Sequence, residues 1–348
     1  MPSQAPLTPR AAERLARESA VQSFDNAARA LCIDWCMEAL DGKQVQRWGE
    51  ALGAVLVRER DAEVLAYRGG RRPLCPANRP QLLVVGMDGG RYQGREKDPQ
   101  TQSRWREDKV LSVSTYLPGD GQEGPDARDP EPLVTTYVAT ARDAHTFGRM
   151  AAVEAERRGY RQAQVVIGMG DGGNWIDPLL GRDLRVDARI IDWCHASEHL
   201  WDCAKAAFGA DTPQAAAFGE HAEALLWDGR VVDVIATIAR ELQRLGQPRD
   251  SDSPQDPRRV LHQNVGYFTR HQQHMNYPEY RRKGWPIGSG VTEAAVKQCN
   301  KRVKGTEQFW TEGGVESILA LRVMWISQDQ RWERTWANRP AYVNTEPA

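Results

Sequence analysis

Two periodicities divide the chain into a helical beginning and a region of strands. Over residues 23–65, apolar positions recur every three or four residues, which predicts helices. Within this region, residues 39–48 have the outline of a helix, a turn at Gly42 and a second helix. Residues 1–22 are polar and rich in alanine and arginine, and we expect a tail there that is either frayed or a marginal helix. Residues 66–80, rich in arginine, glycine and proline, are expected to form a linker.

Short apolar runs replace the helical period after residue 80. Residues 82–87 form an apolar run that ends at Asp88 and two glycines, which predicts a buried strand. Residues 143–158 have the pattern of an amphipathic helix. Four further strands are predicted, at residues 109–117, 133–140, 163–169 and 188–193. This order predicts an α/β fold with a mixed sheet flanked by helices.

The second half of the chain returns to the helical period. Residues 211–283 are predicted to form an α-helical insertion, with a loop rich in Asp, Ser and Pro at residues 247–258. The domain that contains the sheet would therefore consist of residues 81–210 and 284–330. Residues 331–348, rich in Trp and Arg, are expected to form a C-terminal tail.

The last predicted helix follows a tight loop rich in glycine, serine and proline. Ser289 is the expected N-cap, which places Glu293 in the first turn. Ala295, Cys299 and Val303 repeat every four residues, which indicates a face packed on the sheet. Another face carries Glu293, Lys297, Asn300, Lys301 and Lys304. Taken alone, that face fits a solvated surface of paired charges.

Local charge is more informative than the net charge, which is −1. Between residues 281 and 305, seven cations accompany the single anion Glu293: Arg281, Arg282, Lys283, Lys297, Lys301, Arg302 and Lys304. Such a cluster is suited to the phosphates of a nucleic-acid backbone. No apolar run reaches the length of a membrane span, so we expect a cytoplasmic protein without a membrane partner. Six scattered cysteines favour reduced thiols.

Three acidic residues stand where a metal site would need them. Asp88 and Asp171 each end a predicted strand and precede two glycines, and Glu293 begins the last helix. Converging carboxylates raise one another's pKa unless cations neutralise them. Hard oxygen ligands select Mg²⁺ or Mn²⁺, and two such ions about 4 Å apart serve in-line displacement at phosphorus. Any one Asp-Gly-Gly taken singly is better explained as a turn.

The helical beginning contains a candidate DNA-reading element. In a helix-turn-helix, the start of the second helix contacts base edges. The residues of this chain at that position are Lys43, Gln44, Gln46 and Arg47. A helical hairpin that does not touch DNA has the same outline and is more common.

Cysteine and histidine residues allow a zinc interpretation at two places. Cys32 and Cys36 lie one helical turn apart, but no second pair follows at zinc-finger spacing. A second set would line one helix face with Cys194, His195, His199 and Cys203, although no residue supplies a fixed fourth ligand position. The simpler expectation is that His195 orients a carboxylate or contacts a phosphate, and that His199 packs in the core.

Four motifs occur in a fixed order along the chain: VGMDGGR at residues 85–91, GMGDGGNWI at 168–176, DWCHASEH at 192–199 and PIGSGVTE at 286–293. With these motifs the chain resembles the DDE-type transposases of bacterial insertion sequences, specifically the ISKra-type group, and more distantly the Mutator-class elements. The resemblance extends from about residue 23 to residue 340. The N-terminal region of this chain is short beside that of the longer family members, so we expect the module that recognises the terminal repeats to be reduced or missing.

The resemblance implies an RNase H-like core interrupted by a helical insertion, with Asp88, Asp171 and Glu293 as the catalytic metal-binding triad. It implies two Mg²⁺ ions, for which Mn²⁺ can substitute. Asp192 and His195 match the family's C/D-x-x-H element, and we expect Lys297 and Asn300 to support the site. The implied reaction is nicking at the element ends and attack of the freed 3′-hydroxyl on target DNA.

The implied partners are DNA, as terminal repeats and as target, and a second copy of the chain in a synaptic complex that is a dimer or larger. The implied location is the bacterial cytoplasm, at the nucleoid. Two alternatives remain: an RNase H-like nuclease that cuts without joining, and a DNA-binding regulator that has lost catalysis. The intact acidic trio argues against the regulator, because an inactive site has no need of three converging carboxylates.

Overall fold

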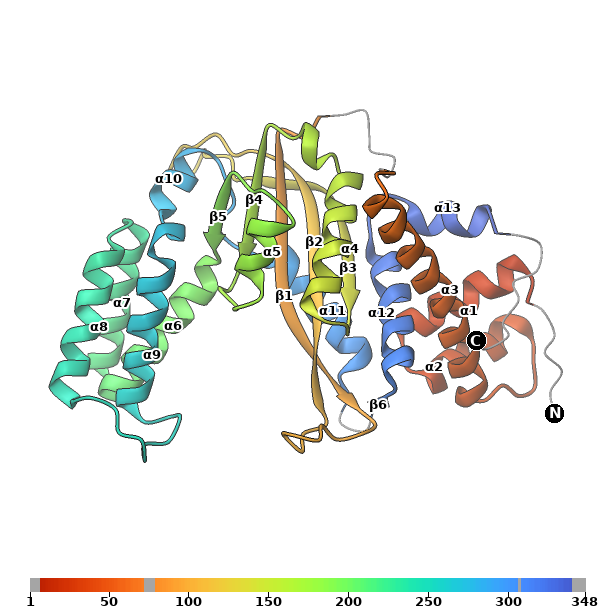
Figure 1. Cartoon of the computed structure of the whole chain (residues 1–348), viewed down its shortest axis with the longest axis horizontal. Helices are drawn as coiled ribbons and strands as arrows, with labels where there is room; N and C mark the ends of the chain where they lie inside the picture. Colours follow the sequence, from red (N-terminus) through yellow and green to blue (C-terminus); the bar gives the residue numbers. More distant parts are fainter. Residues whose placement is uncertain (1–6, 72–78, 306–307, 340–348) are drawn as a thin grey trace.

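A mixed sheet forms the centre of the molecule (Figure 1). The computed structural model describes residues 7–71, 79–305 and 308–339. The strand order is β3-β2-β1-β4-β5, and β6 pairs with β1. The pairs β1–β2 and β2–β3 are antiparallel, whereas β1–β4, β4–β5 and β1–β6 are parallel. The strands are β1 Leu82–Gly94, β2 Trp105–Leu117, β3 Glu131–Thr140, β4 Val165–Gly170, β5 Ala188–Ile191 and β6 Phe309–Trp310. The predicted mixed α/β fold is confirmed, and this strand order is the RNase H-like arrangement that we expected.

The apolar run of β1 is continuous because helices cover both faces of the sheet. Leu83, Val85 and Met87 pack on α4 (Ala144–Arg157) and α5 (Ile176–Arg182), while Leu82 and Val84 point to the opposite face. On that opposite face, α11 (Gly290–Val303) and α12 (Glu312–Ile326) cover β1 to β3.

Glycine at position 86 allows α11 to lie very close to β1. A Cβ at Gly86 would stand 2.0 Å from the Thr292 Oγ1, which itself hydrogen-bonds the Ser112 Oγ at 2.8 Å. The predicted sheet-facing residues Ala295, Cys299 and Val303 are fully buried, as expected. Ser289 occupies the N-cap position, but its side chain makes no capping hydrogen bond.

The described residues of the two predicted tails, 7–22 and 331–339, are largely helical. Residues 9–21 form α1 (Pro9–Val21), whose Ala12, Leu15, Ala16 and Ala20 are fully buried. Spacings of three, one and four residues place these small side chains on one face, although charged residues between them conceal the pattern. Residues 331–337 form α13 (Arg331–Ala337), and Arg331 pairs with buried Glu154 of α4 at 2.5 Å. Burial raises the pKa of Glu154, but Arg331 and Arg157 outweigh it and lower that pKa to about 2.

The predicted helix-turn-helix has a different outline. Helix α2 (Phe24–Trp35) ends earlier than expected, at a left-handed Cys36 with φ 53°, and residues 36–41 are not helical. Helix α3 (Gly42–Arg68) then begins with a capping box in which Asp41 and Gln44 satisfy each other's backbone N–H groups. The helix continues through part of the predicted linker, and residues 72–78 of that linker lie outside the described residues.

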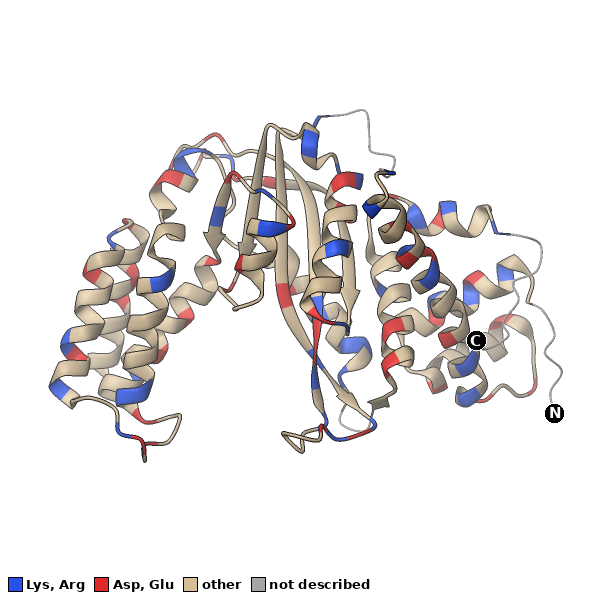
Figure 2. Cartoon of the chain, in the orientation of Figure 1, with Lys and Arg blue, Asp and Glu red and all other residues tan. Residues whose placement is uncertain are grey.

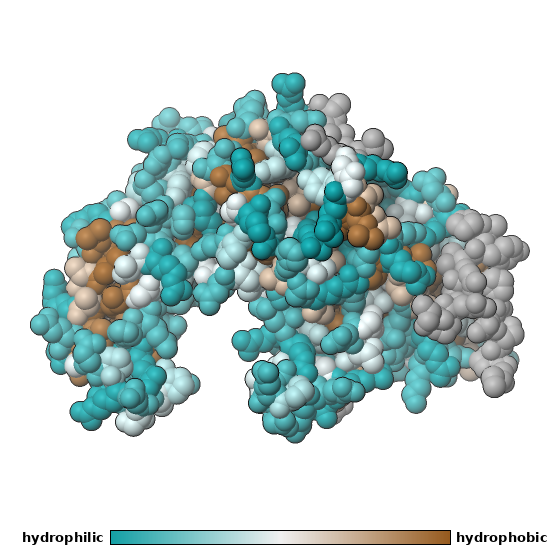
Figure 3. Space-filling view, viewed as in Figure 1, coloured by the Kyte–Doolittle hydropathy of each residue, from teal (hydrophilic) through white to brown (hydrophobic). Residues whose placement is uncertain are grey.

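A lobe of helices extends from β4 and β5. Helix α6 (Trp193–Phe208) leads to α7 (Pro213–Trp227), α8 (Val231–Leu245), α9 (Pro257–His271) and α10 (Tyr277–Arg282). Figure 3 shows a hollow between this lobe and the lower end of the β1–β2 hairpin, and Figure 1 places the ends of β4 and β5 at its roof. None of the described helices combines the length and the hydrophobicity needed to cross a membrane.

Candidate metal centre

Asp192 connects the end of the sheet to the loop that precedes α11. It follows β5 directly and caps α6, where its Oδ1 accepts a hydrogen bond from the His195 N–H at 2.9 Å. Its Oδ2 accepts a second hydrogen bond, from the Ser289 N–H. The side chain is fully buried, and the two backbone donors compensate for its lost hydration. Asp192 therefore fixes where α11 begins relative to β5.

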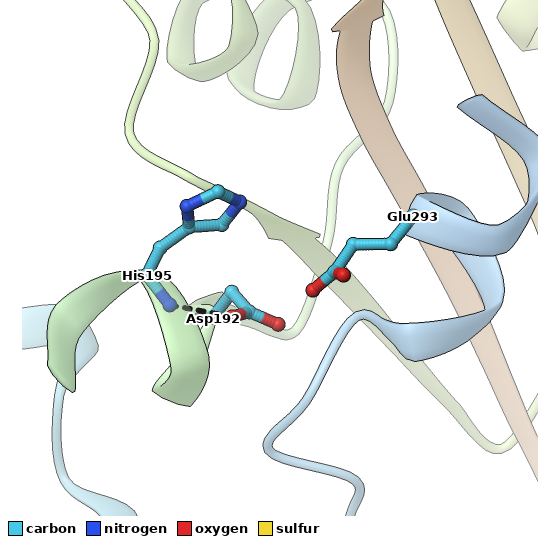
Figure 4. A group of neighbouring side chains, drawn as sticks. All are labelled: Asp192, His195 and Glu293. Carbon is cyan, nitrogen blue, oxygen red and sulfur yellow. Dashed lines mark hydrogen bonds between the residues drawn. The ribbon is translucent and has the colours of Figure 1, made fainter. Parts of the chain in front are cut away.

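Glu293 approaches Asp192 from the first turn of α11, where the helix dipole favours a carboxylate. The Lys297 Nζ, one turn later, donates to its Oε2 at 3.1 Å. Potential ligand atoms of Asp192, His195 and Glu293 all lie within 4.8 Å of one another. Figure 4 shows the two carboxylates facing each other, with the imidazole beside them. These three residues form a candidate metal-binding cluster.

Asp88 and Asp171 lie side by side at the adjoining parts of two parallel strands. The last registered pair of β1 and β4 joins Gly86 to Met169, and each aspartate stands two residues beyond. The Asp88 Oδ1 accepts from the Gly89 N–H at 2.6 Å, and the Asp171 Oδ1 accepts from the Gly173 N–H at 2.8 Å. Both side chains are partly exposed. The parallel pairing thus brings together two carboxylates that are far apart in sequence.

The pKa of Asp88 also depends on the charges of Glu293 and His195. Burial raises the pKa of Asp88, and the negative charges of Asp171 and Glu293 raise it further, while the Gly89 N–H and His195 lower it. The three predicted ligands therefore share one neighbourhood. Among residues 7–71, 79–305 and 308–339, however, the three residues whose potential metal-ligand atoms lie within 4.8 Å of one another are Asp192, His195 and Glu293. Neither Asp88 nor Asp171 belongs to this group.

Helix α9 holds the loop that carries Asp171. The Tyr267 hydroxyl donates to the Asp171 backbone carbonyl at 3.1 Å. Gly172 has φ +92°, and a Cβ there would lie 2.9 Å from the His271 Nε2, so both the backbone conformation and the available space require glycine. The Arg270 guanidinium reaches the Asn174 Oδ1 at 3.5 Å. Sequence reasoning missed these contacts, because only the tertiary fold places α9 beside the loop.

The zinc set proposed on α6 is not assembled. His199 stacks on Tyr267 with ring centroids 3.9 Å apart and hydrogen-bonds the Asn264 Oδ1 at 2.6 Å. Burial lowers the pKa of His199, as expected for a core histidine. Cys203 is fully buried, and burial raises its pKa to about 12. In the described part of the chain, Cys32 and Cys36 join no cluster of metal ligands either.

The predicted DNA contacts on α11 separate into exposed and buried residues. Lys301 and Lys304 are exposed. Arg302 is buried, and its prediction as a DNA contact is wrong. Its guanidinium lies over the rings of Phe24 and Trp310 and donates to the Ser19 carbonyl at 2.6 Å. Burial lowers the pKa of Arg302 to about 9. The helical period turns this position toward α1 and α2 rather than toward solvent.

The remaining predicted DNA contacts differ in whether their side chains already interact with other residues of the chain. Lys43, Arg47 and Arg282 are exposed. The Gln44 side chain belongs to the capping box, and Gln46 donates to Glu50 at 2.7 Å. Arg281 stacks over Trp227 at 3.7 Å and pairs with Glu123 at 2.9 Å, and Lys283 pairs with Glu279 at 2.7 Å. Asn300 accepts a hydrogen bond from the Arg91 N–H at 3.2 Å, which holds α11 against β1.

Asp108 is a further acid that sequence reasoning missed. It is fully buried on β2 opposite Gly90, and neither of its carboxylate oxygens has a hydrogen-bond partner. Burial raises the pKa of Asp108 to about 7, with smaller contributions from the charges of Glu107 and Asp88. Asp108 lies just before residues 109–117, where the strand was predicted, so the sequence pattern gave no reason to expect its burial on β2.

Comparison with known proteins adds little to what the geometry of the site indicates about function. No protein-family model and no curated protein sequence matches the chain. Among solved structures, the chain is similar to the Drosophila P element transposase strand transfer complex, with a TM-score of 0.38, 10% sequence identity and 94% of each chain covered. We draw no argument from a similarity this distant.

Proposed function

We propose that the protein is a divalent-metal-dependent DNA transposase of the DDE type, which nicks DNA at the ends of an insertion sequence and joins the freed 3′-hydroxyl to target DNA. One observation supports this function above the others. Asp88, on β1, and Asp171, directly after the neighbouring parallel strand β4, interact electrostatically with Glu293, which the fold brings from the far end of the domain. The three sequence motifs that contain these residues, together with the motif at residues 192–199, support the ISKra-type assignment.

The donor set fits hard divalent cations. Asp88, Asp171 and Glu293 offer oxygen ligands. Burial raises the pKa of Asp88, the negative charges of Asp171 and Glu293 raise it further, and a bound cation would relieve the repulsion among the three carboxylates. We therefore assign these three residues as the ligands of two Mg²⁺ ions, with Mn²⁺ as a substitute. When bound, such ions activate the attacking oxygen and stabilise the leaving oxygen of a phosphodiester.

The residues around the triad position it. Asp192 accepts from the N–H groups of His195 and Ser289 and so sets the start of the Glu293 helix. Lys297 neutralises part of the Glu293 charge, and Asn300 holds α11 to β1. The His195 imidazole stands beside two carboxylates, where it can bind a cation as a nitrogen ligand or donate to a phosphate oxygen.

DNA is the proposed partner, both as terminal repeats and as target. Lys301 lies on α11, the helix that carries Glu293, and Lys304 directly follows this helix; both side chains are exposed. Lys43 and Arg47 lie at the start of α3. Point charges of this kind hold phosphates without reading sequence. Because two ends must be held together for joining, the active assembly is proposed to be a dimer or larger.

A strand-transfer assay separates this function from its two alternatives. Pre-cut duplexes taken from the DNA that flanks the coding region would be incubated with target plasmid and Mg²⁺, using the wild-type protein and Asp171→Ala. Joining by the wild type that Asp171→Ala lacks supports the proposal. Cleavage of uncut ends without any joining indicates a nuclease, and DNA binding without either reaction indicates a regulator.

A further inference from the structure

The β1–β2 hairpin extends beyond the part of the sheet that carries the candidate metal centre. Pairing of β1 with β4 ends at Gly86 and Met169, yet β1 continues to Gly94 before β2 returns from Trp105. This part of the hairpin, beyond the pairing with β4, forms one side of the hollow, and the helical lobe forms the opposite side (Figures 1 and 3). We call residues 91–106 together with Phe309 the hairpin tip.

Two aromatic rings are exposed on one rung of the hairpin tip. Gln93 of β1 pairs with Trp105 on one side and with Phe309 of β6 on the other. Residues on one rung point to the same face of a sheet, and the outer two are about 10 Å apart, or two strand spacings. Trp105 is 43% exposed and Phe309 is 42% exposed. The tip therefore presents two aromatic rings, one on each side of a glutamine.

Cations accompany both rings. The Lys304 Nζ lies 5.8 Å from the Trp105 ring centroid, and the Arg104 guanidinium lies 5.1 Å from that of Phe309. Residues 91–106 carry five cations against the two anions Glu96 and Asp98. Figure 2 shows these charges along the hairpin. Arg95 also lines a cavity of about 180 Å³ together with Gln46 of α3, which connects the tip to the start of that helix.

We propose that the hairpin tip binds an unpaired DNA strand, with bases stacked on Trp105 and Phe309 and phosphates held by the surrounding cations. The inference rests on the proposed function, because that function makes DNA the substrate of the neighbouring carboxylates. Base stacking on aromatic rings and a basic surface together are how proteins hold single strands without regard to sequence. A duplex keeps its base faces within its own stack, so it offers the two rings no equivalent contact.

Binding without chemistry tests this proposal. Fluorescence anisotropy in EDTA would compare a labelled 20-nucleotide single strand of mixed sequence with the duplex of the same sequence. Trp105→Ala and Phe309→Ala are each expected to weaken single-strand binding at least about fivefold, while duplex binding changes less than about twofold. Val232→Ala is the control, because Val232 is an exposed apolar side chain, at 69%, but lies in the helical lobe.

Conservative variants separate stacking from packing. Trp105→Phe keeps an aromatic face and should retain most single-strand affinity, whereas Trp105→Leu keeps apolar volume and should bind as weakly as Trp105→Ala. Equal affinity of the Phe and Leu variants would overturn the stacking role. An equal loss for single strand and duplex would mean that the tip binds duplex DNA, and the proposal would be wrong. Because EDTA removes the metal ions, a failure here leaves the strand-transfer result intact, and a failure of strand transfer leaves this result intact.

Discussion

Glu293 illustrates how one side chain can serve two groups of residues. It contributes to the tight cluster with Asp192 and His195, and its charge adds to the burial that raises the pKa of Asp88. A carboxylate in this position is held by its helix and by Lys297 rather than by burial, because the side chain is partly exposed. Removing its charge should therefore affect cation binding more than it affects the fold.

We expect Glu293→Gln to lower DNA cleavage by more than about 100-fold, beyond the loss typical of residues that only support a metal ligand. DNA affinity measured in EDTA should stay within about twofold of wild type, because the phosphate contacts remain. Cleavage at the wild-type rate by Glu293→Gln would show that the metal assignment is wrong.

Asp108 gives a pH prediction with a definite sign. Its folded-state pKa of about 7 exceeds the ordinary value, so between about pH 4 and pH 7 the unfolded chain loses its proton while the folded chain keeps it. The free energy of unfolding therefore falls as pH rises through that window. The advantage of Asp108→Asn over wild type in the free energy of unfolding should be larger at pH 8 than at pH 5, by about 1–3 kcal/mol. Urea denaturation at the two pH values measures this, and equal differences at both would contradict it.

At the scale of elements, the α9 helix braces the Asp171 loop from outside the sheet. Tyr267 contacts the loop backbone through its hydroxyl while its ring stacks on His199 of α6. Three elements, α6, α9 and the loop after β4, thus meet at one aromatic ring. The helical lobe is therefore part of what positions the candidate ligand, although it lies outside the sheet.

Tyr267→Phe removes the hydroxyl and keeps the stacked ring. We expect kcat for DNA cleavage to fall about tenfold with KM for DNA unchanged, and the Mn²⁺ concentration needed for half-maximal activity to rise. Tyr280→Phe is the matched control, because its hydroxyl also contacts a backbone carbonyl, that of Arg189, at 3.4 Å. A similar loss in both variants would indicate a general effect of the lobe and not of the Asp171 loop.

For the molecule as a whole, the sequence predicted those features that depend on local pattern. Apolar runs located the strands, and a four-residue repeat located the buried face of α11. It did not show that Arg302 is buried, because the aromatic rings that surround it come from α2 and β6. Nor could it show the bracing by Tyr267, which depends on tertiary contact between distant segments. The sequence placed Asp88 at the end of a strand, but β1 continues to Gly94, and Asp88 comes near Asp171 because the pairing of β1 with β4 ends at Gly86 and Met169. The tight grouping of Asp192 with Glu293 was not predictable from the sequence.

The two neighbouring cations of α11 give a prediction about the whole proposed DNA-binding surface. Lys301 is exposed and Arg302 is buried, so Lys301→Ala should weaken binding to all DNA sequences alike and reduce the slope of log affinity against log salt by about one. Arg302→Ala should leave that slope unchanged and lower thermal stability. Titrations at several salt concentrations, with a melting curve for each variant, measure both effects. An unchanged slope for Lys301→Ala would remove that residue from the DNA surface.

The covering of the sheet by α11 and α12 has a consequence for synthesis on the ribosome. One face of β1 to β3 stays bare until these late helices emerge, and α3 also waits for α12 as its packing partner. Glu293 arrives with the same helices. A nascent chain that stops before α11 therefore lacks both the cover of this face and the carboxylate of Glu293.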